Sequence, residues 1–419
     1  MFLISLGSGA NYFHQNFQPP ASYQGNSEPF NFPKDDTLRL VGIMSQFTLE
    51  NPDNPKTSGN GQFLSGGSED YINFFESEEP RCEGFLVDSP PHNLSYFQKQ
   101  LEAVGNYYTN VSDSNLLYTA EIISNSPGNG YYTVSHEMEY YAKGDTLLAR
   151  FFSEVLDLAK SDVEDYFSTT IFTPDDVVFI VFHAGLSQDF SYPSIDPTIY
   201  DLKSAYIDTI MMEDIVPTKI LQNGNVYEIK TGVLLPETQN IIYYHVVEDI
   251  FGNPDYGAEN LCYTQVGLTG IFAFLLGYEL GLPPMFNNDA TSIHYGEPGV
   301  GLFGLMDQGS NNGLGVIPVA PTPWTRIKAG WDVADIIPSN NTDTILIEAY
   351  DLNNKIYKVD ISESEYFLIE NRNNWVLTEA DIDSLRRAQK NDDNQLGYWF
   401  DVVTDSLGEF VQNNLIEID

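Results

Sequence analysis

One stretch of the chain, GIFAFLLGYELGLPPMF at residues 270–286, limits most strongly what this sequence can fold into. Its apolar residues occupy every side of a helix rather than one stripe, and a helix of that kind belongs in a protein interior. The longer run from Val266 to Leu282 contains four glycines and Glu279. This run therefore predicts a buried helix rather than a membrane span. The rest of the chain has to supply a core that surrounds it.

Composition is consistent with such a core, since 42% of the 419 residues are hydrophobic and 13% are aromatic. The charge is strongly acidic, with 60 Asp and Glu against 19 Lys and Arg, a net charge of −41. A surface this negative repels phosphate groups, so we expect no nucleic-acid partner and no binding to anionic membranes. An acidic coat keeps a secreted protein soluble, and it is also compatible with calcium binding. Calcium therefore stays open as a cofactor, without assigned ligands.

The N-terminal residues 1–36 are rich in Asn, Gln, Pro, Phe and Tyr and show neither a helical nor a strand period. They predict an extended arm that lies on the surface or docks on another molecule. The opening MFLISLGSGANYF is similar to the end of a signal peptide but lacks a basic segment. We expect export to the exterior or to the cell surface. Cys82 and Cys262 predict either one disulfide in an oxidising compartment or two buried thiols, and both remain open.

Periodicity indicates an α+β fold. Residues 37–47 predict a strand, and SYFQKQLEAVGNYY predicts an amphipathic helix capped by Ser95. A second helix is predicted from Leu147, with Phe151, Val155, Leu156 and Ala159 on one face. The apolar run that begins at Val177 predicts a strand buried on both faces. A helix, a buried strand and a further helix are typical of a layered α/β or α+β core.

The last part of the chain has a different pattern. Residues 343–371 alternate in strand fashion after a Gly- and Pro-rich segment, which predicts a mostly antiparallel sheet. We therefore expect an N-terminal arm at 1–36, a main domain at 37–335 and a β-rich region at 336–419. The last region is expected to be incomplete, because its final strand barely begins before the sequence ends.

Six segments, in order, carry a resemblance to a known family. They are PPHNLSYFQKQLEAVGNYY at 90, VVFIVFHAG at 177, GYELGLPPMF at 277, GLFGLMDQGS at 301, PTPWTRIKAGW at 321 and EYFLIENR at 365. Over residues 37–375 the chain resembles the immune inhibitor A family of secreted zinc metalloproteases. The resemblance implies a zincin-like domain with a mixed sheet, an active-site-type helix and a Met-turn, followed by a β-rich C-terminal region.

The metal-binding helix departs from that family. Its signature is HExxHxxGxxD, and with the glycine placed at Gly281 the two histidines correspond to Phe274 and Tyr278. The general-base glutamate corresponds to Leu275, and the third ligand corresponds to Pro284. A catalytic zinc needs three N, O or S ligands and a carboxylate that takes the proton of the bound water. We therefore expect no zinc and no catalytic residue.

Other residues of the former cleft are retained. Met306 stands at the Met-turn position, and we expect it to pack against the two aromatic side chains of the helix. The possible vestigial binding cleft comprises Phe274, Tyr278, Glu279, His183, His294 and Met306. A lone histidine such as His183 is more often a hydrogen-bonded structural residue. Neither His294 nor Glu279 lies on the i, i+4 face that a rebuilt zinc site would use.

The sequence thus predicts an exported pseudoprotease that serves as a structural, adhesive or binding module. Its expected partners are protein or peptide segments, and the arm at residues 1–36 is the expected region of self-association. The alternative is an active secreted metallopeptidase with a non-standard metal site.

Overall fold

The computed structural model describes residues 35–66, 88, 90–125, 130–190, 196, 198–244, 247–248, 254–255, 261–289, 291–338, 344–347, 355–362, 365–372, 402–404 and 410–413. The predicted arm, apart from Asp35 and Asp36, lies outside these residues, and so does Cys82. The backbone of Cys262 is described, but its side chain is not. Both readings of the two cysteines therefore stay predictions.

A mixed sheet forms the centre of the main domain, with the strand order β2–β1–β4–β8–β5. Neighbouring strands are parallel except at β5, which runs antiparallel to β8. A short strand, β3, continues the parallel pairing beside the end of β1. The strands are β1 (Thr37–Gln46), β2 (Leu117–Ile123), β3 (Tyr132–Thr133), β4 (Val178–His183), β5 (Ala205–Ile207) and β8 (Gly232–Pro236).

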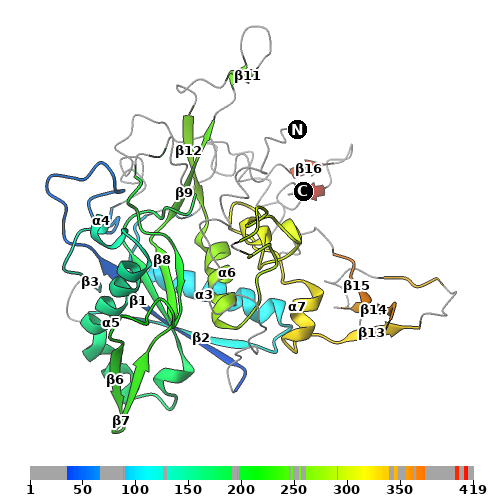
Figure 1. The fold of residues 1–419 in the computed structure, drawn as a ribbon, viewed down its shortest axis with the longest axis horizontal. Helices are drawn as coiled ribbons and strands as arrows, with labels where there is room; N and C mark the ends of the chain where they lie inside the picture. Colours follow the sequence, from blue (N-terminus) through cyan, green and yellow to red (C-terminus); the bar gives the residue numbers. More distant parts are fainter. Residues whose placement is uncertain are drawn as a thin grey trace.

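Helices cover both faces of this sheet (Figure 1). On one face lie α3 (Leu94–Val111) and α6 (Leu268–Glu279), and on the other lies α5 (Asp145–Ser168). Alternation along β4 shows the two faces. The ring of Phe182 lies 4.7 Å from that of Phe97 in α3 and 6.0 Å from that of Phe272 in α6. The ring of Phe179 instead lies 6.3 Å from that of Phe167 in α5.

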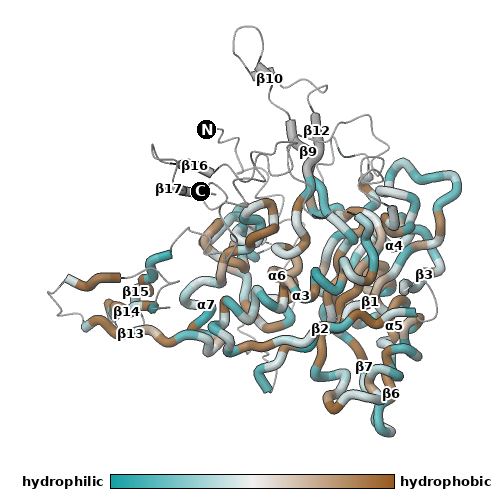
Figure 2. The backbone as a smooth tube through the Cα atoms, turned by 180° about the vertical axis from the view of Figure 1, so that it is seen from behind, coloured by the Kyte–Doolittle hydropathy of each residue, from teal (hydrophilic) through white to brown (hydrophobic). Residues whose placement is uncertain are grey.

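The predicted core residues are buried in this arrangement. All six residues of β4 are buried because the strand is covered on both sides. The predicted face of α5, formed by Phe151, Val155, Leu156 and Ala159, is fully buried. The residues of the central strands and of α6 are correspondingly mostly hydrophobic (Figure 2). No helix in the described part of the chain is long and apolar enough to cross a bilayer.

Both helices start two residues before the predicted positions. The N-cap of α3 is Asn93, whose side chain accepts a hydrogen bond from the Tyr96 amide at 3.2 Å. The prediction of Ser95 as the cap is therefore wrong, because an asparagine two residues earlier fills that role equally well. The second helix, α5, begins at Asp145 rather than at Leu147.

A smaller sheet of three strands follows the main domain and projects from it beyond α7 (Pro323–Lys328) (Figure 1). It consists of β13 (Ala334–Ile337), β14 (Ile356–Asp360) and β15 (Tyr366–Ile369). The predicted antiparallel pairing holds for β14 with β15, whereas β13 pairs parallel with β14. The expected boundary between residues 335 and 336 falls inside β13.

The remaining elements are short. They are α4 (Met138–Tyr141), β6 (Thr218–Gln222), β7 (Asn225–Ile229), β9 (Gln239–Tyr244), β10 (Val247–Glu248), β11 (Pro254–Asp255), β12 (Leu261–Val266), β16 (Val402–Thr404), β17 (Phe410–Asn413) and the 3₁₀ turns Pro174–Asp176, Gly301–Phe303 and Gln308–Asn311. The molecule is thus a mixed α and β protein built on a mixed sheet, as predicted.

Candidate functional site

The centre of the candidate site is the middle of α6, where Phe274, Leu275 and Tyr278 are all buried. The rings of Phe274 and Tyr278 meet edge to face, with centroids 5.1 Å apart and an interplanar angle of 77°. Their i, i+4 spacing places them on one side of the helix. Two further rings extend the cluster: Phe286 lies 6.5 Å from Phe274, and Tyr206 of β5 lies 6.3 Å from Tyr278.

Met306 packs closely against the same helix. A Cβ atom added at Gly277 would lie 2.5 Å from the Met306 sulfur and 3.2 Å from the Tyr108 hydroxyl oxygen. No side chain at residue 277 fits without displacing the methionine. The Met306 carbonyl also accepts a hydrogen bond from the Met285 amide at 2.8 Å. The turn therefore holds both α6 and the segment that leaves it.

Asp307 fixes the shape of this turn. One oxygen of its buried carboxylate accepts hydrogen bonds from the backbone amides of Gly299, Val300 and Gly301 at 2.8 to 2.9 Å. The other oxygen accepts from the Gln308 amide at 2.8 Å. A carboxylate that satisfies four backbone amides is a structural element of the turn.

Glu279 stands at the last turn of α6, where its carboxyl group faces Thr231 and Tyr206. The Thr231 hydroxyl donates to Glu279 Oε1 at 3.3 Å. Burial raises the pKa of Glu279, and the hydrogen bonds from Tyr206 and Thr231 oppose that rise only in part. Glu279 therefore adjoins the aromatic cluster through Tyr206.

Three of the predicted residues, namely His183, His294 and Pro284, do not take part in the aromatic cluster of α6. His183 lies on the α5 face of the sheet, 5.9 Å from the ring of Phe47 and 6.2 Å from that of Phe151. Its Nδ1 atom lies 2.9 Å from the Ala184 carbonyl oxygen, and burial lowers its pKa to about 4. The inclusion of His183 in a cleft with α6 is therefore corrected, because residue parity in β4 directs its side chain to the other layer. His294 is exposed, and its Nδ1 atom lies 2.7 Å from Glu297 Oε1. Pro284 is half-buried in the segment after α6.

The chemistry of the central residues is apolar. Phe274 and Leu275 carry no group that binds a metal or accepts a proton, and a phenol with an ordinary pKa near 10 is a weak ligand at neutral pH. Within the described ranges, no three His, Cys, Asp or Glu side chains are grouped so that they could hold a metal ion.

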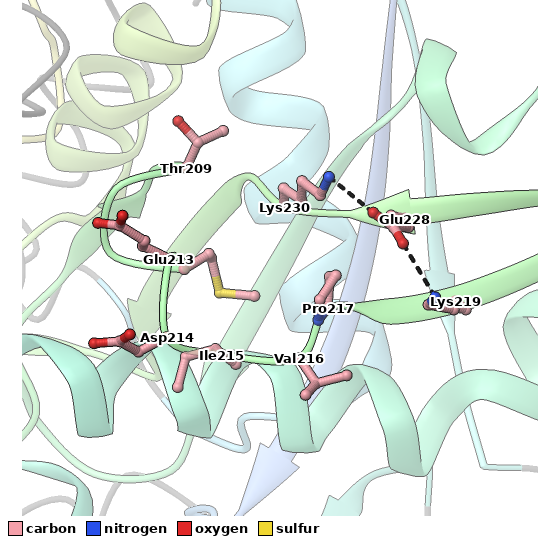
Figure 3. Close-up of a pocket in the computed structure, with 10 residues that line it drawn as sticks. Thr209, Glu213, Asp214, Ile215, Val216, Pro217, Lys219, Glu228 and Lys230 are labelled. Carbon is pink, nitrogen blue, oxygen red and sulfur yellow. Dashed lines mark ion pairs between the residues drawn. The ribbon is translucent and has the colours of Figure 1, made fainter.

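A surface pocket of about 630 Å³ lies between the loop after β5 and the β6–β7 hairpin. Lys230, Glu228 and Lys219 form a row of ion pairs along one wall, and Glu213 and Asp214 project from the loop opposite (Figure 3). The sequence contains no motif that marks this pocket, because its lining comes from two segments without a functional pattern. The lysines are already paired with Glu228, at 3.1 Å for Lys219 and 2.8 Å for Lys230.

A buried polar cluster at the start of α6 was also not predicted. His92 and Glu237 are fully buried there, with 2.7 Å between Nδ1 and Oε2. They are separated by 145 residues in the sequence, so only the fold could bring them together.

We compared the sequence with known proteins. No family model matches it, and no curated protein matches it significantly.

Proposed function

We propose that the chain is a non-catalytic, metalloprotease-like protein that binds extended protein or peptide segments outside the cell. The observation that carries this proposal is the ring contact of Phe274 with Tyr278 in the middle of α6. These two buried rings stand at the positions that the resemblance assigns to a zincin's metal ligands, and they supply neither metal ligands nor a general base.

The topology supports a zincin-like scaffold. A mostly parallel sheet ends in one antiparallel edge strand, β5, and two helices, α3 and α6, share one face. A methionine in a tight turn packs under the second helix at Gly277. The mixed sheet, the buried helix and the methionine turn are compatible with what the resemblance implies, and on this proposal the helix persists because it packs in the core.

The edge strand supports binding of an extended segment. Within the described residues, β5 is the last strand of the sheet and pairs with β8, and an extended segment can bind by adding to the edge of a sheet. Tyr206 lies in the middle of this strand and reaches the aromatic cluster of α6. A bound segment would therefore lie beside the former catalytic region. Export and self-association through residues 1–36 belong to the same proposal, as does the expected lack of zinc.

The binding proposal is tested with fluorescently labelled, unfolded casein as the probe. We expect a saturable complex in which the casein stays intact and amide exchange at residues 205–207 slows. The hairpin β6–β7 serves as an internal control, because its amides should exchange at an unchanged rate. A complex that protects the hairpin instead of β5, or no complex at all, would contradict the proposal.

A further inference from the structure

The buried cluster at the start of α6 places both ring nitrogens of His92 against acceptors. Its Nδ1 atom lies 2.7 Å from Glu237 Oε2, and its Nε2 atom lies 3.0 Å from the backbone carbonyl oxygen of Asp88. The side chains of His92 and Glu237 are both completely buried. In surroundings of such low polarity these hydrogen bonds are stronger than they would be at the surface.

The partners determine how many protons His92 carries. A carbonyl oxygen only accepts, so the Nε2 atom has to donate to Asp88. Glu237 Oε2 also accepts from the Leu64 amide at 2.9 Å, and Oε1 accepts from the Gly185 amide at 2.7 Å. Both oxygens of the Glu237 carboxyl group thus accept from backbone amides, and hydrogen bonds of this kind favour a carboxylate, to which Nδ1 then donates as well.

We propose that His92 is a buried imidazolium ion and that it acts as an alkali-sensitive latch, so that loss of its proton loosens the start of α6 and the loop around Leu64.

The latch joins segments that are far apart in sequence. The His92 amide donates to the Leu64 carbonyl at 2.7 Å. Asp88 Oδ2 accepts from the amide of Leu268, the first residue of α6, at 3.2 Å. Asp88 is also held by Gln265, whose amide nitrogen donates to the Asp88 carbonyl at 2.8 Å. Movement of the imidazole would therefore disturb both the loop and the start of the helix.

Two charged groups face His92, namely Glu237 and Asp88. The other neighbours are neutral at physiological pH: the Tyr96 ring stacks on the imidazole at 4.4 Å, and Gln100 donates to Asp88 Oδ1 at 3.1 Å. A protonated His92 neutralises Glu237. A neutral His92 leaves a buried carboxylate without a counter-charge, which is strongly destabilising.

The pKa shifts agree with this geometry. Burial lowers the pKa of His92, but the hydrogen bonds and charges of Glu237 and Asp88 together outweigh burial, so the pKa ends above its ordinary value. Burial raises the pKa of Asp88 to about 6. A histidine whose pKa is raised on folding contributes its full stabilisation below the unfolded pKa, near 6.5. That stabilisation is lost as the pH rises through the folded pKa, so the latch opens on the alkaline side.

The direct test is nitrogen NMR of the full chain with ¹⁵N-labelled histidine rings. At pH 7 we expect both ring nitrogens of His92 to show imidazolium shifts. The His92 signals are assigned by their loss in His92→Gln, or by substituting the other five histidines in turn if that variant does not fold. One pyridine-like nitrogen on His92 at pH 7 would overturn the proposal.

The predicted loss of stability on deprotonation of His92 is tested by denaturant unfolding between pH 6.5 and 9.5. Wild type should lose more stability over this range than His92→Gln, and the difference between their slopes should correspond to about one proton held by the folded state. The matched control His294→Gln should keep the wild-type slope. Identical slopes for wild type and His92→Gln would show that His92 is not the latch.

Discussion

Two glycines of α6 allow neighbouring segments to approach the helix closely, Met306 at Gly277 and the backbone of Ser310 at Gly270. At Gly277 an added methyl group would meet the flexible end of Met306, whereas at Gly270 it would lie 2.0 Å from the backbone oxygen of Ser310. We predict that Gly277→Ala destabilises the fold by about 1–3 kcal/mol, as overpacking usually does. Gly270→Ala should cost more, because backbone yields less than a methionine side chain. Urea unfolding of both variants measures the difference.

A double-mutant cycle provides the control for Gly277. Met306→Ala removes the clashing atoms, so the double variant should lose less stability than the sum of the losses of the two single variants. Strictly additive losses would mean that the two residues do not compete for the same space.

The sequence was sufficient to predict which side chains lie together where helical spacing alone determines their positions. The i, i+4 spacing of Phe274 and Tyr278 was sufficient to predict that the rings share a face, and the structure shows them in contact. His183 was misplaced because in a strand one residue of register exchanges the two faces. Phe182 turns toward α6, so its neighbour His183 turns toward α5.

At the scale of elements, a buried cluster of ion pairs connects Arg326 of α7 with Glu370, the residue that follows β15. Arg326 is fully buried and donates to Asp332 and to Glu370, each at 2.6 Å, while Glu370 also pairs with Arg372. We predict that Glu370→Gln destabilises the fold by about 3–5 kcal/mol, because it leaves buried positive charge without its partner. Chemical denaturation followed by tryptophan fluorescence measures this loss.

The control lies in the same sheet, where Lys355 pairs with Asp335 at the exposed surface. Lys355→Gln should change the stability by less than about 1 kcal/mol. Equal effects of the two substitutions would contradict the view that burial of Arg326 makes the first contact important.

Elements with strong periodicity were predicted well, and short elements were not. The strands β1 and β4 and the helices α3 and α5 each carry a run of apolar residues whose period matches the structure. The edge strand β5 has only three residues, and α7 has only six. Such segments carry too few residues for a period. The parallel pairing of β13 with β14 depends on the path of the chain between them, which no local pattern specifies.

At the scale of the whole molecule, pH should affect stability in an unusual direction. Among the residues that the structure describes, burial raises the pKa of Asp88 and Asp189 to about 6 and also raises the pKa of Asp201, Glu50 and Glu279. The folded state therefore holds more protons than the unfolded state above about pH 4, so stability falls as the pH rises through this window. Repulsion within a chain of net charge −41 acts in the same direction.

We therefore predict a higher urea midpoint at pH 5.5 than at pH 7.5. Repeating the comparison in 1 M NaCl separates the two causes, since salt screens the surface charges and leaves the buried carboxyl groups largely unaffected. A smaller but persistent difference is expected in salt. Greater stability at pH 7.5 under both conditions would show that the buried carboxylates are stabilised as ions.

The most direct test of the central claim is the zinc content of protein purified without chelator, measured together with cleavage of unfolded casein. The packing of Phe274 with Tyr278 predicts no stoichiometric zinc and intact casein. About one zinc per chain, with cleavage that a chelator abolishes, would contradict the claim and establish a metal site built from other residues.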